Sequence, residues 1–250
     1  MDQSFAARLR RGERLLGTLL SLPSPELAEV AAAAGCDWLW LDMEHGLIGP
    51  AEAQRIIQAA GERCAPVIRN PELAEMWVKK ALDSGAAGII VPHVDSAEQA
   101  ALAVRWSKYP PDGGRSVGFT RANMFGERFE GHLARANAQT ALVAQVEHID
   151  GVHNIEAIVA VPGVAAILIG PFDLSASLNK TGRLDDPEVR AAIDRVRNVC
   201  AVKAMPLGVY AKDVAAAREA LDAGYTFVCV GLDAAIYASA VADIIRALKH

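Results

Sequence analysis

The sequence lacks the long apolar runs and basic blocks that mark several classes of protein. No run approaches the roughly 18 apolar residues of a membrane span, and the start, MDQSFAARLRRG, has no apolar segment behind its charges. We therefore expect neither a transmembrane helix nor a signal peptide. The formal net charge is −5, and no stretch rich in Lys or Arg stands out, which argues against a nucleic-acid partner. These absences predict a cytoplasmic protein.

Cysteine is scarce as well. The four cysteines stand apart in apolar surroundings, with no CxxC or Cys–His spacing: Cys36, Cys64, Cys200 and Cys229. This pattern indicates neither a zinc site nor a disulfide framework, and we expect buried free thiols in a reducing compartment. What is present, 52% hydrophobic and 22% charged residues in a chain of 250, is typical of a folded enzyme the size of one TIM barrel.

A repeat of supersecondary structure organises the chain. Eight short, nearly continuous apolar runs are predicted to be parallel strands buried on both faces: Leu16–Leu22, Trp38–Met43, Pro66–Arg69, Gly88–Val94, Ala141–Glu147, Ala166–Ile169, Leu207–Tyr210 and Phe227–Val230. Stretches with helical periodicity lie between them: Pro25–Ala34, Glu52–Ala60, Glu72–Ser84, Ser96–Lys108, Pro187–Ala204 and Val214–Ala223. Glycine follows several of these helices, where it tolerates the left-handed conformation that ends a helix.

This alternation predicts a closed (β/α)8 TIM barrel that spans residues 1–250 as one domain. A doubly wound open sheet is the competing arrangement, but the segment after the first strand, SLPSPELAEV, lacks the glycine-rich turn of dinucleotide-binding sheets. Two connections are longer than a barrel needs, at residues 110–132 and 174–186. The second follows a strand's carboxyl end, where barrel active sites lie, whereas the first is expected at the opposite face or in a subunit contact.

Polar residues follow the carboxyl ends of the predicted strands. The second strand ends in LDMEHG, which contains His45, the third ends at Arg69, and the sixth ends in GPFDLS, which contains Asp173. In AQVEH, at the fifth strand, Gln145 and Glu147 are two residues apart and therefore share a face. Two carboxylates from neighbouring strand ends, Glu147 and Asp173, predict a divalent-metal site that leaves positions open for substrate.

The ordered strings DMEHG, PVIRN, IIVPHV, YPPDGGRSVG, AQVE and IGPFDLS resemble the HpcH/HpaI family of class II pyruvate aldolases over nearly the whole chain. That family includes 4-hydroxy-2-oxoheptanedioate and 2-keto-3-deoxy sugar-acid aldolases. The resemblance implies a TIM barrel of the phosphoenolpyruvate/pyruvate type. It implies reversible cleavage of a 4-hydroxy-2-keto acid into pyruvate, or a close 2-keto acid, and an aldehyde. It also implies a Mg²⁺, Mn²⁺ or Co²⁺ cofactor and a homo-oligomer, a hexamer or trimer, with a C-terminal helix near 234–248 exchanged between subunits.

The resemblance also implies a role for individual residues: metal ligands Glu147 and Asp173, proton acceptor His45, enolate-stabilising Arg69, and pyruvate contacts Gln145, Phe172 and Asp173. Asp83, in LDSG, matches an aspartate that strengthens the histidine as a base. Phe172 departs from the family's pattern, in which a small residue is common, so we expect a narrower aldehyde pocket. His93 and His148 match none of these roles and are interpreted as structural.

Three other functions stay open from the sequence. A Schiff-base aldolase needs a lysine in the barrel mouth, and Lys212, in VYAKD after the seventh strand, is the candidate. The second open function is another lyase of the same superfamily, a CoA-ester lyase or a decarboxylating synthase. The basic pocket that CoA or phosphate would require is indicated only by the loop around Arg115–Arg128. The third is a non-catalytic metal-binding assembly barrel, which fold alone does not exclude; pure metal binding would not require both His45 and Arg69.

Overall fold

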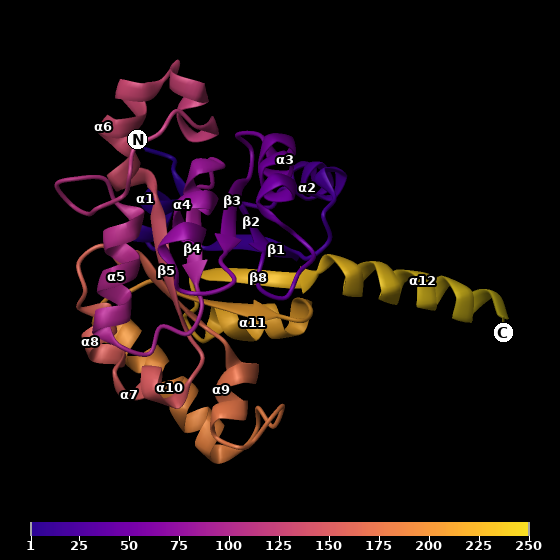
Figure 1. Cartoon of the computed structure of the whole chain (residues 1–250). Helices are drawn as coiled ribbons and strands as arrows, with labels where there is room; N and C mark the ends of the chain where they lie inside the picture. The colour runs from indigo at the N-terminus through magenta and orange to yellow at the C-terminus, as the bar shows by residue number, and fades with distance from the viewer. Residues whose placement is uncertain (1, 250) are drawn as a thin grey trace.

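Eight parallel strands close into a barrel in the computed structural model, which describes residues 2–249 (Figure 1). The strands are β1 (Leu15–Leu20), β2 (Trp38–Asp42), β3 (Ala65–Arg69), β4 (Gly88–Val91), β5 (Ala141–Val146), β6 (Ala166–Ile169), β7 (Leu207–Ala211) and β8 (Phe227–Leu232). Each strand pairs with the next in the chain, and β8 closes the sheet against β1. The predicted (β/α)8 TIM barrel is confirmed, and each predicted strand corresponds to one observed strand.

The strands appear in the sequence as apolar runs because one face of each packs inside the barrel and the other packs against helices. Every residue of β4, β5 and β6 is buried, as expected for parallel strands between a packed interior and a layer of helices. Inside the barrel, the Trp38 ring lies 5.7 Å from the rings of both Phe5 and Phe227. Phe5 belongs to α1 (Phe5–Arg10), and Trp38 and Phe227 begin their strands, so α1 closes the amino-terminal end of the barrel.

The six predicted helices are present, with ends that differ by at most three residues: α2 (Pro25–Ala33), α3 (Pro50–Ala60), α4 (Glu75–Asp83), α5 (Ala97–Ser107), α10 (Pro187–Val202) and α11 (Val214–Asp222). Side-chain caps fix several of the starts. Ser24, Ser96 and Asp213 each accept a hydrogen bond from a backbone N–H of the first turn, which satisfies an amide that otherwise has no partner inside the helix.

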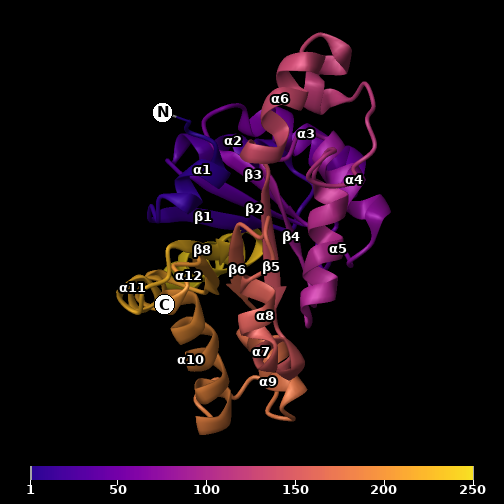
Figure 2. The same cartoon turned by 90° about the vertical axis from the view of Figure 1, so that its left-hand side faces the viewer.

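The two long connections contain helices that the sequence did not predict. The first connection, residues 110–132, includes η1 (Arg121–Gly126) and the start of α6 (Phe129–Gln139). The second, residues 174–186, begins with the last four residues of α9 (Pro171–Ser177). Two further short helices follow β5, namely α7 (Ile149–His153) and α8 (Ile155–Val159). Figure 2 shows α6 at the end of the barrel where β5 starts and α7 to α9 at the end where it finishes. The first connection is therefore at the face opposite the strands' carboxyl ends, as expected.

The last helix, α12 (Asp233–Lys249), projects away from the barrel (Figure 1). Asp233 is its one buried residue, and large apolar side chains on it are exposed: Ile236, Tyr237, Val241, Ile244, Ile245 and Leu248. An apolar face of this kind is typical of a surface that another chain covers. Exchange of this helix between subunits stays a prediction.

The expectation of buried free thiols is confirmed for three of the four cysteines. All four cysteines are free, and Cys64, Cys200 and Cys229 are buried, whereas Cys36 is half-buried. Burial raises the pKa of the Cys64 and Cys200 thiols to about 12, which keeps them protonated and unreactive near neutral pH. Within residues 2–249, no helix has both the length and the apolar character needed to cross a membrane.

The packing of Gly208 inside the barrel gives a first prediction. A Cβ atom at Gly208, in β7, would overlap the fully buried ring of Phe227. We expect Gly208→Ala to destabilise the protein by about 1–3 kcal/mol, the usual cost of overpacking a core. The matched control is Gly118→Ala, whose Cβ would meet only a Thr120 methyl at 3.5 Å. Denaturant midpoints measure the difference, and equal midpoints for the two variants would refute the prediction.

Candidate active site at the carboxyl end of the barrel

A cavity of about 420 Å³ opens at the carboxyl ends of the strands. Its volume lies in the range of sites for small molecules. It is lined by Leu19, Ser21, Trp40, Asp42, His45, Arg69, Gln145, Ile169, Gly170, Pro171, Phe172, Asp173, Leu184, Tyr210 and Leu232. The structure thus brings most of the predicted site residues together around one space.

Arg69 is the fixed cation of this cavity. The register of the sheet places Asp42 of β2 beside Arg69 of β3. Arg69 Nε and Nη2 donate to the two oxygens of Asp42 at 2.9 and 2.7 Å, and its guanidinium lies 4.9 Å from the centre of the Trp40 ring. Burial lowers the pKa of Arg69, but the hydrogen bonds and charge of Asp42, together with the charges of Glu44 and Glu147, raise it by more, so that the net pKa is above its ordinary value. The side chain is a permanent charge in one orientation.

Glu147, directly after β5, is a buried carboxylate that lies behind Gln145. One of its oxygens, Oε1, accepts from the backbone N–H of His93 at 3.0 Å, and the other accepts from the Gln145 side-chain amide. The predicted shared face of Gln145 and Glu147 is confirmed. Burial raises the pKa of Glu147, although these hydrogen bonds and His93 oppose that rise. Gly170 makes room for the carboxylate, because a Cβ there would lie 2.7 Å from Glu147 Oε2.

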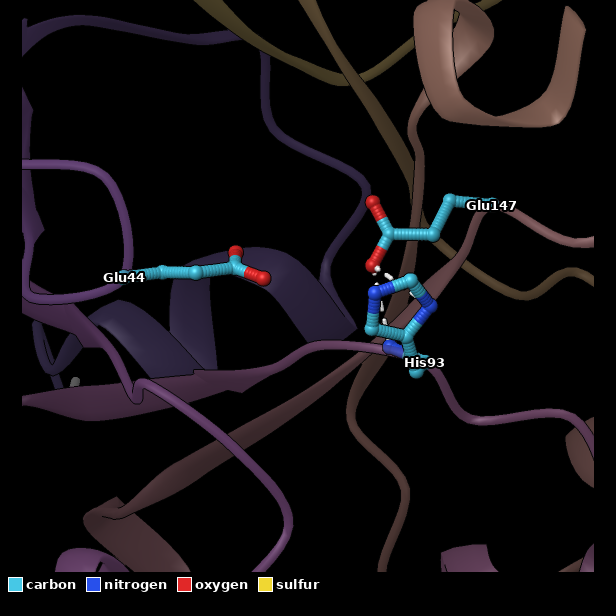
Figure 3. A group of neighbouring side chains, drawn as sticks. All are labelled: Glu44, His93 and Glu147. Atoms are coloured by element: carbon cyan, nitrogen blue, oxygen red, sulfur yellow. Dashed lines mark hydrogen bonds and ion pairs between the residues drawn. The ribbon is translucent and has the colours of Figure 1, made fainter. Parts of the chain in front are cut away.

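Glu147 forms a cluster with Glu44 and His93 (Figure 3). One possible ligand atom from each of the three lies within 4.8 Å of the other two, and His93 Nδ1 is 3.7 Å from Glu147 Oε1. Figure 3 shows the Glu44 carboxylate directed at the pair that His93 and Glu147 form. Glu44 Oε2 lies 3.1 Å from Arg69 Nη1, yet this contact lacks hydrogen-bond geometry, and among the described residues the oxygen has no hydrogen-bond partner. Burial raises the pKa of Glu44, against the charge of Arg69.

Two carboxylates and an imidazole at this spacing form a donor set for a divalent cation. Ligands of an octahedral ion with bonds of about 2.1 Å lie roughly 3–4 Å from one another, so the three side chains would need only small movements. Asp173, which the sequence paired with Glu147, lies outside this group. It is exposed in the first turn of α9 and lines the cavity beside Gln145.

The structure does not bring Asp83 to His45. Asp83 is the last residue of α4, which runs back from the carboxyl end of β3 to the amino-terminal end of the barrel, and its Oδ1 accepts from Arg115 Nη2 at 2.9 Å. His45 is exposed on the loop after β2 and lines the cavity. Lys212, the candidate for a Schiff base, lines a different hollow, beside α12.

Sequence reasoning gave no role to Asp42, Glu44 or His93. The alternation of side chains along an extended segment places Asp42 and Glu44 on one side of the strand end, and that signal was available in DMEHG. His93 stands at the end of the fourth strand, in IIVPHV, but its backbone hydrogen bond to Glu147 left no signal in the sequence.

Comparison with known proteins identifies the family of the chain. The sequence model of the HpcH/HpaI aldolase/citrate lyase family matches residues 16–240 of this chain. The chain is 39% identical to a hydroxypyruvate/pyruvate aldolase of Paraburkholderia phytofirmans, over 91% of this chain and 90% of that protein. It is 36% identical to a 4-hydroxy-2-oxovalerate aldolase of Novosphingobium aromaticivorans, over 97% and 93% respectively. A solved structure of an HpcH/HpaI aldolase/citrate lyase family protein from Burkholderia cenocepacia J2315 superposes with a TM-score of 0.95, at 38% identity over 100% of both chains.

The chain is a TIM barrel with a buried arginine and carboxylates at the carboxyl end of its strands, and the two relatives just named are aldolases, a class of carbon–carbon lyases. The chain belongs to the HpcH/HpaI aldolase/citrate lyase family and is an enzyme of the aldolase type. The resemblance predicted from the sequence is confirmed.

The pair that Asp42 and Arg69 form gives the second prediction. Asp42→Asn keeps the size of the side chain but removes the charge that neutralises Arg69. We expect a loss of about 3 kcal/mol in the free energy of unfolding, the scale for breaking a buried ion pair. The control is Glu156→Gln, which removes the partner of Arg195 from a bridge whose side chains are 50% and 45% exposed; it should cost at most about 1 kcal/mol. Similar losses in both variants would contradict the proposed importance of the buried pair.

Proposed function

We propose that this enzyme is a divalent-metal-dependent aldolase that reversibly cleaves a 4-hydroxy-2-keto acid into pyruvate, or a close 2-keto acid, and an aldehyde. The observation that carries the proposal is the placement of the Arg69 cation beside the cluster of Glu44, His93 and Glu147. This arrangement combines a fixed positive charge with donors for a metal ion where negative charge would develop on a 2-keto acid. The names of the two relatives above, both aldolases, support the same reaction type.

Glu147 is the central ligand in this proposal, because it is buried, held by two hydrogen bonds and surrounded by further donors. Asp173 is the second ligand that the family resemblance implies, and Glu44 and His93 are the donors that the geometry adds. When bound, a divalent cation would act as a Lewis acid toward the 2-keto group. Gln145 orients Glu147 and keeps its own Oε1 buried without a hydrogen-bond partner among the described residues, facing a site that a ligand can complete.

Arg69 would stabilise the enolate that forms when the C3–C4 bond breaks. Asp42 holds the guanidinium in place before substrate arrives, so no reorganisation is needed as charge builds up on the enolate oxygen. The backbone amides of Phe172 and Asp173 belong to the first turn of α9 and have no partner inside that helix. We propose that these two amides donate hydrogen bonds to the carboxylate of pyruvate.

His45 would serve as the base. Its backbone N–H donates to Asp42 Oδ1 at 3.3 Å, so the carboxylate that orients Arg69 also positions the loop that carries His45. In the cleavage direction, a base takes the proton of the C4 hydroxyl, the C4–O bond becomes the aldehyde carbonyl, and the electron pair of the C3–C4 bond passes to the enolate. A neutral imidazole at the cavity mouth can accept this proton near neutral pH.

The third prediction concerns His45. His45→Ala should lower the rate of pyruvate release by roughly 10²–10⁴-fold, the usual contribution of a positioned general base. Added imidazole should restore part of the rate, and pyruvate affinity, measured by calorimetry with Mn²⁺ present, should change little. The control is His148→Ala, because His148 directly follows Glu147 but does not line the cavity, and its Nδ1 accepts from the backbone N–H of Asp150 at 3.2 Å. A variant of His45 with normal turnover would remove it from the mechanism.

The fourth prediction concerns the metal. Chelator treatment should abolish activity, and Mg²⁺, Mn²⁺ or Co²⁺ should restore it. Glu147→Gln should weaken Co²⁺ binding, measured by calorimetry, by at least about 10-fold, a loss typical of a disrupted metal site. Affinity should fall with decreasing pH, starting above the usual range for glutamate. The reason is that burial raises the pKa of Glu147 and Glu44, and protons then compete with the cation.

Two variants separate the candidate ligands. His93→Ala should change the visible absorption spectrum of the Co²⁺-loaded enzyme if the imidazole binds the ion, and Asp173→Asn should weaken binding if that carboxylate does. Full activity in excess chelator, with borohydride trapping a pyruvate adduct on a lysine, would refute the metal proposal in favour of Schiff-base chemistry.

A further inference from the structure

The charged side chains of the cavity lie on one side only. Its charged and amide side chains come from the ends of β2, β3 and β5 and from α9: Asp42, His45, Arg69, Gln145 and Asp173. The ends of β7, β8 and β1 contribute Tyr210, Leu232 and Leu19 instead. These three strands pair with one another in the sheet, so their side chains form a continuous wall opposite Arg69 and Gln145.

Ser21, at the end of β1, already has a partner in the fold, and Tyr210 adds a hydroxyl whose pKa burial raises, so that it is uncharged near neutral pH. Ser21 Oγ donates to Asp233 Oδ1 at 2.8 Å, and Asp233 Oδ2 accepts from the backbone N–H groups of Ser21 and Leu22, both at 3.0 Å. Lys212, the cation that follows β7, lines the hollow beside α12 and not this cavity. The wall therefore offers an occupant no unpaired charge from the described part of the chain.

Phe172 and Leu184 extend this wall outward from the strands. Phe172, on α9, is 58% exposed at the mouth, and Leu184 lies in the loop after α9. An occupant that covers the Phe172 ring gains the free energy of removing apolar surface from water. The side chains of Leu19, Phe172, Leu184, Tyr210 and Leu232 are called the apolar arc below.

We propose that the apolar arc receives the chain of the aldehyde partner, so that the enzyme prefers aldehydes with uncharged, apolar chains over those that carry a carboxylate, a phosphate or several hydroxyl groups. This inference rests on the proposed aldolase function. With the 2-keto acid held at Arg69 and Gln145, the arc is the part of the cavity left for the second reactant. A carboxylate there would lose its hydration without a cation to replace it, which is costly, because the neutral Tyr210 hydroxyl can donate a single hydrogen bond.

The synthetic direction makes the test direct. The nucleophilic C3 of the enolate attacks the aldehyde carbon, the new C3–C4 bond forms, and the aldehyde oxygen takes up a proton to become the C4 hydroxyl. Butanal and succinic semialdehyde are a matched pair of aldehydes, because a terminal methyl in one replaces a carboxylate in the other. We expect kcat/KM for addition to pyruvate to be at least about 10-fold higher with butanal, the discrimination expected of an apolar pocket.

A variant in the arc should shift this preference. Leu184→Arg places a cation on a loop, where the risk to folding is small, and Leu184→Gln is the neutral control of similar length. We expect Leu184→Arg to move the ratio of the two kcat/KM values toward succinic semialdehyde by at least about 10-fold, an effect that added salt weakens. Leu184→Gln should leave the ratio within about threefold of its original value, because it adds no charge.

The outcomes distinguish the inference from the function on which it rests. Faster addition to succinic semialdehyde than to butanal by the unaltered enzyme would overturn the apolar arc while leaving the aldolase function intact. An unchanged ratio in Leu184→Arg, with both aldehydes still used, would also overturn it. Failure to form product from pyruvate with any aldehyde, in the presence of Mn²⁺, would overturn the aldolase function and the inference together.

Discussion

The Asp42 carboxylate fixes the polar half of the site. It binds the Arg69 guanidinium through two hydrogen bonds and also accepts from the backbone N–H groups of Glu44 and His45, at 3.1 and 3.3 Å. A buried guanidinium needs a partner of opposite charge, because an unpaired charge in the interior is strongly destabilising. The register of β2 against β3 supplies that partner. Closure of the barrel thus sets the register, the register makes the ion pair, and the ion pair positions the residues proposed for catalysis.

Glu147 is the second fixed point, and its surroundings carry a conformational cost. His93 donates its backbone N–H to Glu147 while holding a φ of 51°, in the left-handed region. For a residue other than glycine this conformation costs roughly 1–2 kcal/mol, and such strain is often retained at functional sites. Burial raises the pKa of Glu147, so the carboxylate is less favourable there than in water until a positive charge compensates it. Both features are consistent with a site organised to bind a cation.

The sequence predicted the barrel well because parallel strands covered on both faces appear as continuous apolar runs. It also located His45, Arg69 and Gln145, because the carboxyl ends of barrel strands point to one rim. Helix α6 and the short helices α7 to α9 were missed, and short helices depend on tertiary contacts more than on periodicity. The contact between Asp83 and Arg115 and the backbone donor at His93 were equally invisible, because both arise between segments distant in the chain.

The division of the cavity into a polar side and an apolar side follows from how a closed barrel is built. Each strand contributes one end to the rim. Neighbouring strands can therefore contribute charged side chains, while the opposite strands contribute apolar side chains that determine the shape of the cavity. The network around Asp42 joins β2 and β3, whereas the one around Asp233 joins the start of α12 to the end of β1. The loop after β2 meets the second network through the backbone, where Leu47 N–H donates to the Ser21 carbonyl at 2.9 Å. Among residues 2–249 the side-chain hydrogen bonds of the two networks share no residue, so side chains on the β7, β8 and β1 side can change without loss of the Arg69 ion pair. A barrel of this design can therefore keep one reaction while its aldehyde partner varies.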